Sequence, residues 1–177
     1  MQDMSQGPFF RRFLAEDRDT TLREIAADRT RLAEARRSGD LPAEMVISIG
    51  IGFGLYVTAN EVEAVPMLDS ALVLARQLGD QQAEIETLLH LATARQYLGE
   101  RRLAQELFQE ALDRSETYGI AEFTHFILHH RGRCYVEQGM LDDARRAFEQ
   151  ALALRELLGN PRFIQSSRAA LAQLTAG

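Results

Sequence analysis

The sequence repeats itself every 40 residues. Glycines recur at this interval as Gly79, Gly119 and Gly159, and a second pair, Gly99 and Gly139, has the same spacing. Three groups of apolar residues follow it too: Ala64, Leu68 and Ala71; Ala104, Phe108 and Ala111; Ala144, Phe148 and Ala151. A fixed period of this size indicates a solenoid, in which each unit buries its apolar face against its neighbours. It therefore favours a binding surface over an enzyme pocket.

The glycines divide the chain into predicted helices, because glycine tolerates the left-handed turn that ends a helix. One helix is predicted over about 121–138 and the next over about 141–158. The same pattern predicts helices over 41–58, 61–78, 81–98, 101–118 and 161–175, and the apolar spacing within 20–38 predicts another. Only four prolines occur in 177 residues, so we expect an all-α protein.

Composition narrows the class of protein. The net charge of −6 argues against general nucleic-acid binding, which needs a basic face. All twenty basic residues are arginine, so lysine chemistry is excluded. A single cysteine, Cys134, excludes an intrachain disulfide. The start of the chain lacks the features of a signal peptide, and the apolar stretch at 45–59 is too short and glycine-rich for a membrane span. We therefore expect a cytoplasmic protein with no membrane contact.

The third repeat resembles the tetratricopeptide repeat family. The residues that carry the resemblance are Gly132, Tyr135, Gly139, Ala144, Phe148 and Ala151. The second repeat matches with Leu91, Ala92, Gly99, Ala104, Phe108 and Ala111, and the first with Ile51, Gly52, Leu55, Ala64, Leu68 and Ala71. The departures are the missing tryptophan, the absent late proline, and a period of 40 instead of 34, which suggests the longer-period variety of bacterial regulators and kinesin-light-chain-like arrays.

The resemblance implies antiparallel helical hairpins stacked into a right-handed superhelix, an α-solenoid. Residues 41–177 would form three hairpins and a C-terminal capping helix, and residues 1–40 would form N-terminal capping helices or an arm, all in a single domain. It also implies a non-catalytic module that binds a peptide or protein partner in its concave groove, with no cofactor. The alternative is a self-associating regulatory domain of the bacterial transcriptional-regulator type, a homodimer.

The family's groove is lined mainly by the first helix of each hairpin. Carried onto this sequence, its positions are Val46, Ile49, Phe53 and Tyr56 in the first hairpin, Glu86, Leu89, Thr93 and Tyr97 in the second, and Phe126, His129, Arg133 and Glu137 in the third. These residues grade from apolar to polar along the chain. We therefore expect a groove whose N-terminal end is hydrophobic and whose C-terminal end is polar.

The first groove helix is apolar on every side, so something should cover its concave face. The candidates are an N-terminal docking arm with Phe9, Phe10, Phe13 and Leu14, a second copy of the protein, or a ligand. The arm segment itself reads either as a capping helix over the first repeat or as a chain that docks on another surface. Glycines at 50, 52 and 54 indicate a helix that is kinked or packed unusually close to a neighbour.

Two clusters in the third repeat are candidate sites. His125 and His129 share one helical face, which is the spacing of two metal ligands, but the usual third ligand is missing, so ordinary groove histidines are favoured. Four arginines, Arg131, Arg133, Arg145 and Arg146, form either a solvated face with local ion pairs or a site for an acidic peptide or carboxylate. Cys134 reads as a small buried residue, and no catalytic constellation is apparent.

Overall fold

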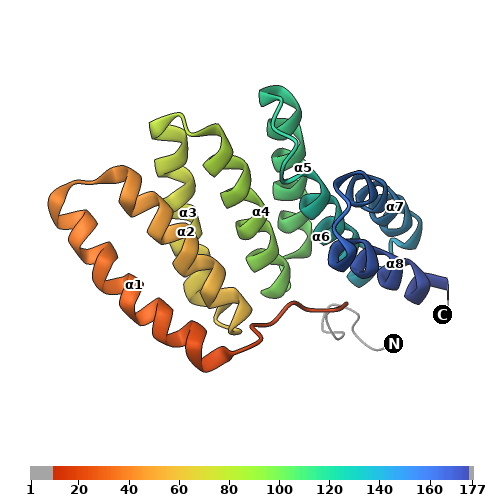
Figure 1. Ribbon diagram of the computed structural model, residues 1–177, viewed down its shortest axis with the longest axis horizontal. Coiled ribbons are helices and arrows are strands. Elements are labelled where there is room, and N and C mark those ends of the chain that lie inside the picture. Colours follow the sequence, from red (N-terminus) through yellow and green to blue (C-terminus); the bar gives the residue numbers. More distant parts are fainter. Residues whose placement is uncertain (1–9, 176–177) are drawn as a thin grey trace.

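The computed structural model describes residues 10–175, which contain eight α-helices and no strand (Figure 1). The helices are α1 (Arg18–Ser38), α2 (Leu41–Val57), α3 (Glu61–Leu78), α4 (Gln81–Tyr97), α5 (Arg101–Tyr118), α6 (Thr124–Glu137), α7 (Leu141–Leu158) and α8 (Pro161–Thr175). The predicted all-α class is confirmed. Among these helices, none has both the length and the hydrophobicity needed to cross a membrane.

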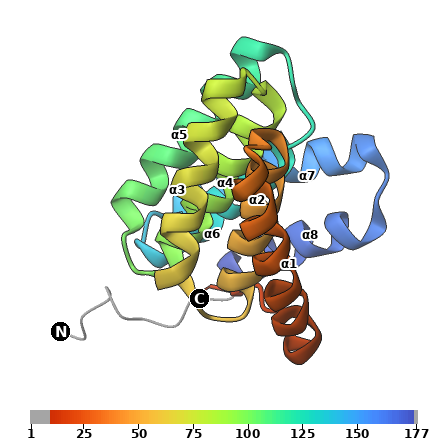
Figure 2. The same ribbon diagram turned by 90° about the vertical axis from the view of Figure 1, so that its left-hand side faces the viewer.

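The helices pack as consecutive hairpins. The most extensive contacts lie within the pairs α2–α3, α4–α5 and α6–α7, and the first helices of the hairpins, α2, α4 and α6, also contact one another in turn. Helix α1 packs on α2 at one end and α8 on α7 at the other. Seen from the α1 end, α7 and α8 lie on the opposite side from α3 and α5, so the array twists along its length (Figure 2). The predicted α-solenoid is therefore confirmed.

The helices end where the repeated glycines occur. Gly39, Gly79, Gly119 and Gly159 have φ angles of 71°, 69°, 68° and 70°, in the left-handed region. Their N–H groups donate to carbonyls of the last helical turn and close it. Ala59 has the equivalent position to Gly99 and Gly139, and it adopts a φ of 68° although it carries a Cβ. The repeat therefore keeps its turn geometry even where the glycine is missing.

Helix α6 begins at Thr124, three residues later than the sequence predicts. Ion pairs hold the two earlier linkers between hairpins: Arg36 pairs with Glu44 across the α1–α2 linker at 2.8 Å, and Arg76 pairs with Glu84 across the α3–α4 linker at 2.9 Å. In the α5–α6 linker, the hydroxyl of Ser115 instead donates to the carbonyl of Ile120 and lies 2.9 Å from the hydroxyl of Thr124. This different linker holds residues 120–123 in a turn, so the predicted start at residue 121 is wrong.

Two glycines of the groove helices allow close packing. A Cβ added to Gly52 would lie 2.5 Å from Cγ of Leu68, and one added to Gly132 would lie 2.8 Å from the ring of Phe148. Leu68 and Phe148 are fully buried. Gly50, in contrast, has nothing within 4 Å of its added Cβ. Of the two readings of the glycine run, close packing at Gly52 is therefore the one that the structure supports.

The chain before α1 is a non-helical arm in its described part, with a turn at residues 10–11 where Arg11 has a φ of 52°. Residues 12–17 are not helical. The N–H of Phe13 donates instead to the hydroxyl of Tyr97 at 3.0 Å, and the N–H of Ala15 donates to the carbonyl of Val57 at 2.9 Å. The arm crosses the lower ends of α2, α4 and α6 (Figure 1). The alternative of a capping helix over Phe10–Leu14 is therefore wrong, because the backbone of this segment bonds to other helices. Phe9 lies outside the described residues.

Candidate functional site

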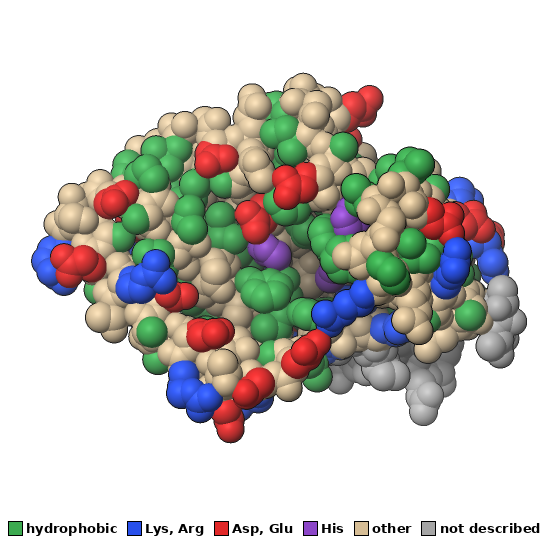
Figure 3. Space-filling view, in the orientation of Figure 1, with side chains coloured by type: hydrophobic (Ala, Val, Ile, Leu, Met, Phe, Trp, Pro, Cys, Tyr) green, Lys and Arg blue, Asp and Glu red, His purple; other side chains and the backbone are tan. Residues whose placement is uncertain are grey.

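A groove of about 1460 Å³ runs across the array. Residues of α2, α4, α6 and α8 line it together with Arg155 of α7, and residues 11–14 and Glu16 of the arm form one edge. The space-filling view shows a hollow in the middle of this face, where histidine side chains lie beside hydrophobic ones (Figure 3). The groove therefore joins all three hairpins to the arm and to the last helix.

The predicted groove residues fall into two sets. Nine line the groove: Val46, Ile49, Phe53, Tyr56, Glu86, Leu89, Phe126, His129 and Arg133. The other three lie beside it. Thr93 is buried and its hydroxyl donates to the carbonyl of Leu89 at 2.9 Å, whereas Tyr97 and Glu137 hold the arm.

The N-terminal end of the groove is apolar and partly open. Val46 is 62% exposed and Phe53 is 38% exposed. The Phe53 ring lies 5.3 Å from the His90 ring and 6.4 Å from the ring of Phe13 in the arm. Tyr56 is buried and its hydroxyl lies 2.9 Å from Nδ1 of His90. The arm thus covers the C-terminal end of α2 and leaves the Val46 end uncovered.

The arm is held through its backbone and through the side chain of Arg12, which donates to the carbonyl of Tyr56 and pairs with Glu61. The N–H of Phe10 donates to Oε1 of Glu137 at 3.1 Å, and Nε of Arg133 donates to the carbonyl of Phe10 at 3.0 Å. The N–H of Phe13 donates to the hydroxyl of Tyr97 at 3.0 Å. Arg12 lies over the Tyr97 ring at 4.4 Å. Side chains at the ends of α4 and α6 therefore bind an extended chain by its peptide groups.

The pKa values of the three histidines of α6 are all lowered, which favours their neutral forms. Burial lowers the pKa of His125 to about 4, with the charge of Arg155 adding to the effect. Burial, then Arg155 and Arg133, hold the pKa of His129 well below its usual value, and burial and Arg133 do the same for His130. In residues 10–175 no three His, Cys, Asp or Glu side chains cluster as metal ligands. His125 instead accepts a hydrogen bond from Nε of Arg155 at 3.2 Å.

The four predicted arginines do not form one cluster. Arg133 lines the groove, Arg131 lies over the Tyr135 ring at 5.2 Å, and Arg146 pairs with Asp143 at 2.5 Å. Arg145 is not among the groove residues. The structure instead brings Arg155 of α7 to the groove, which the sequence reasoning missed. A signal was present, since Arg155 interrupts the apolar face of its helix where the earlier repeats have Ala75 and Ser115.

The groove lining also includes residues that were not among the predicted groove positions: His90, His130, Phe163 and Ser166. Phe163 and Ser166 belong to α8, which the repeat pattern treats only as a cap. Cys134 is fully buried as expected, and burial raises the pKa of its thiol to about 12.

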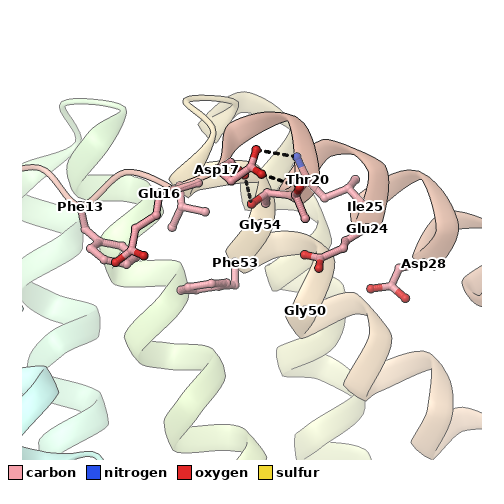
Figure 4. Close-up of a pocket in the computed structure, with 13 residues that line it drawn as sticks. Phe13, Glu16, Asp17, Thr20, Glu24, Ile25, Asp28, Gly50, Phe53 and Gly54 are labelled. Atoms are coloured by element: carbon pink, nitrogen blue, oxygen red, sulfur yellow. Dashed lines mark hydrogen bonds between the residues drawn. The ribbon is translucent and has the colours of Figure 1, made fainter.

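A smaller hollow of about 330 Å³ lies between the arm, α1 and α2 (Figure 4). Four carboxylates, from Glu16, Asp17, Glu24 and Asp28, line it together with the Phe53 side chain. The Asp17 carboxylate caps α1 by accepting from the N–H of Thr20 at 3.0 Å, and hydrogen bonds from Thr20 lower its pKa. This acidic hollow is thus built partly from a helix cap.

Comparison with known proteins agrees with this geometry. A sequence profile of the tetratricopeptide repeat matches residues 125–157, which cover α6 and most of α7. The third hairpin of this chain therefore carries the tetratricopeptide sequence pattern. Two solved structures of TPR-like repeats from a putative kinesin light chain of Podosopora anserina have the same fold. A comparison with curated proteins finds no match.

The first of these structures is 15% identical in sequence, with a TM-score of 0.69, over 87% of this chain and 76% of that one. The second is 14% identical, with a TM-score of 0.59, over 90% of this chain and 87% of that one. Identities this low relate the folds alone. The tetratricopeptide-like fold generally mediates protein–protein interaction.

Proposed function

We propose that this protein is a non-catalytic module that binds an extended peptide segment of a protein partner in its groove. The observation that carries the proposal is the arm, because the array already holds one non-helical segment, its own residues 10–15, by peptide N–H and C=O groups. Such main-chain bonds do not depend on the sequence of the bound segment. A partner's chain could therefore be held by the same kind of contact.

The spacing of these contacts follows the repeat. The groups that accept from the arm belong to Val57, Tyr97 and Glu137, which are 40 residues apart and end α2, α4 and α6. Two or three extended residues span about 7–10 Å, close to the roughly 8–10 Å between packed helices. One acceptor per hairpin therefore matches an extended chain at two or three residues per hairpin.

The groove also suits a peptide in size and lining. Its volume of about 1460 Å³ exceeds the roughly 300–1,000 Å³ typical of small-molecule pockets. Val46 and Phe53 offer exposed apolar surface at one end, where an apolar side chain of the partner would bury area and contribute affinity. The polar groups of α6 would then fix its register.

The proposal is tested with peptides selected from a random phage-displayed library on the full chain. Val46→Glu places a charge in the apolar end of the groove, and Val62→Glu makes the same change at a 75% exposed site on α3, outside the groove lining. We expect Val46→Glu to weaken a selected peptide at least about tenfold in fluorescence polarisation, and Val62→Glu to leave its affinity unchanged. Equal affinity for both variants would contradict the proposal.

The dimer alternative gives a different result in the same experiment. Light scattering of the wild-type chain would then show a dimer, and Val46→Glu would convert it to a monomer without any peptide present. A wild-type monomer that captures peptides through the Val46 end supports the groove proposal instead.

A further inference from the structure

The arm places one arginine side chain in a site that three helices build. The Arg12 guanidinium pairs with the carboxylate of Glu61 at the start of α3, and it donates to the carbonyl of Tyr56 on α2 at 3.3 Å. It also lies over the Tyr97 ring of α4, 4.4 Å from the ring centre. A carboxylate and an aromatic face both suit a planar guanidinium. Glu61, Tyr97 and the carbonyl of Tyr56 therefore form an arginine receptor.

Two aromatic contacts lie on either side of the arginine receptor. The ring of Phe10 lies 6.0 Å from that of Phe148 on α7, and the ring of Phe13 lies 6.4 Å from that of Phe53 on α2. Together with Arg12, these side chains give residues 10–13 the pattern aromatic–x–Arg–aromatic. Each member of the pattern has its own contact on the array. The side chains therefore add a sequence preference to the main-chain bonds of the arm.

Bonds within the array hold the groups that bind the arm. The hydroxyl of Tyr97 accepts from the guanidinium of Arg133 at 2.9 Å. The carboxylate of Glu137 accepts from the side-chain amide of Gln96 at 2.8 Å and is paired with Arg101 at 3.1 Å. The arm contributes none of these bonds, so this surface does not depend on the arm for its geometry. A different chain with the same pattern would find the same contacts.

The arm itself lies outside the buried core. No residue from 10 to 17 is fully buried, and Phe13 is 41% exposed. Phe10 and Ala15 pack against core residues but are only partly buried. Helix α1 keeps its own N-cap, Asp17, without the arm. Departure of the arm would therefore leave the core and the ends of the helices intact.

Glu61 determines the chemistry of any chain that takes the place of the arm. It is 8% exposed with the arm in place, and Arg12 supplies its counter-charge. A partner that covered the same surface without a cation would leave this carboxylate buried and unpaired, which is strongly unfavourable. An arginine of the partner would restore both the ion pair and the contact with the Tyr97 ring. The arginine receptor therefore selects for a basic segment.

We infer that the arm occupies the place of a partner segment with the pattern aromatic–x–Arg–aromatic, and that arm and partner compete for the arginine receptor. The inference rests on the proposed peptide-binding function, and it adds the chemistry of the bound segment and an internal competitor. The partner's chain would run as the arm does, from the end of α6 past α4 to the end of α2 (Figure 1). Because the arm is tethered, it competes at an effective concentration of about 1 mM.

The test uses a labelled synthetic peptide with the sequence of residues 8–16 and a full chain whose own arm is weakened by Arg12→Gln and Phe13→Ser. These substitutions remove contacts of the arm and leave the receptor unchanged. With a dissociation constant of about 0.1 mM, the peptide should bind the weakened-arm chain about tenfold more tightly than the wild-type chain in fluorescence polarisation. Equal affinity for the two chains, or no binding to the weakened-arm chain, would overturn the inference.

Further variants show whether the peptide binds through the arginine receptor. Added to the weakened-arm chain, Glu61→Gln should weaken the peptide at least about tenfold. Glu63→Gln removes the same charge two residues further along α3, where the side chain is 59% exposed, and should change nothing. The peptide carrying Arg12→Gln should bind the weakened-arm chain at least about tenfold more weakly, and it decides the question if circular dichroism shows that the Glu61 variant does not fold. Unchanged affinity for this peptide would also overturn the inference.

The outcomes separate this inference from the proposed function and from exchange between copies. Selected peptides that bind through Val46, while the arm peptide does not bind, would refute the arginine receptor alone. An arm peptide that binds through Glu61, while no selected peptide responds to Val46→Glu, would refute the groove proposal alone. A wild-type dimer in light scattering that the weakened arm converts to a monomer would place the arm of a second copy in the receptor, and it would overturn competition by the chain's own arm.

Discussion

Replacing Gly52 with alanine should destabilise the array, whereas the same change at Gly50, two residues away in the same helix, should not. The Cβ introduced at position 52 would lie 2.5 Å from Cγ and 2.6 Å from Cδ2 of Leu68, far inside ordinary contact. Leu68 is fully buried, so relief requires a shift of the packed hairpin. Overpacking of this kind costs about 1–3 kcal/mol.

The two variants share the gain in helix propensity that comes from replacing glycine with alanine. Alanine is favoured over glycine in a helix by roughly 1 kcal/mol, and this gain applies at both sites because both lie inside α2. Gly50→Ala meets no atom within 4 Å and should therefore stabilise the protein by about that amount. The difference between the variants isolates the packing cost, about 1–3 kcal/mol.

Urea unfolding followed by circular dichroism measures this difference in the free energy of unfolding. Thermal unfolding should show the same order, with about 2–4 °C for each kcal/mol in a chain of this size. A Gly52→Ala variant as stable as Gly50→Ala would refute the reasoning, because it would mean that α2 and α3 do not approach as closely as described.

Three further predictions concern other parts of the chain. Ala59→Gly should raise the free energy of unfolding by roughly 0.5–1 kcal/mol, because glycine adopts the left-handed φ of 68° without strain. Gly99→Ala, at the equivalent turn with a φ of 84°, should lower it, and urea unfolding of both variants measures the two changes. The free energy of unfolding should fall as the pH drops from 6.5 toward 4, because the unfolded state binds a proton on His125 in this range and the folded state, in which the pKa of His125 is about 4, does not. The slope from this group is up to roughly 1.4 kcal/mol per pH unit, and His125→Asn should reduce it. Cys134 should resist a thiol reagent at pH 8 in the native protein and react in urea, and rapid native labelling would contradict its full burial and raised pKa.

The repeat made most of the fold predictable. Glycine caps depend on local φ angles, so the ends of α3, α5 and α7 follow directly from Gly79, Gly119 and Gly159. The late start of α6 was not predictable in this way. It depends on Ser115 meeting Thr124 and the carbonyl of Ile120, which is a contact between two segments and not a property of either one.

The arm shows the same limit more clearly. Its sequence is compatible with a short helix, and its non-helical form is imposed by partners more than 40 residues away, such as Val57 for Ala15 and Tyr97 for Phe13. Nothing in the sequence of the arm itself indicates these contacts with distant residues. Sequence reasoning could name the aromatic residues of the segment and propose a docking arm, but it could not say where the arm would lie.

The sequence predicted which helices form the main surface of the groove, but not all of the residues that line it. Repeat positions on α2, α4 and α6 follow from the period, and nine of the predicted residues line the groove. The contributions of α7 and α8 were missed, because the family pattern draws the groove from the first helices alone. The sequence analysis assigned Arg155 to a structural face of its helix. Its place beside His125 follows from the packing of α7 against α6, and its bond to Ser167 follows from the packing of α8 against α7.

The most direct test of the account is to map where a selected peptide binds, by following the backbone amide signals of the full chain in a titration. The account predicts that perturbed residues lie along the groove, with Val46 of α2, Glu86 of α4 and Phe126 of α6 among them. Perturbation centred instead on the outer helices, at exposed residues such as Val62 of α3 or Leu157 of α7, would contradict the claim that the groove is the binding surface.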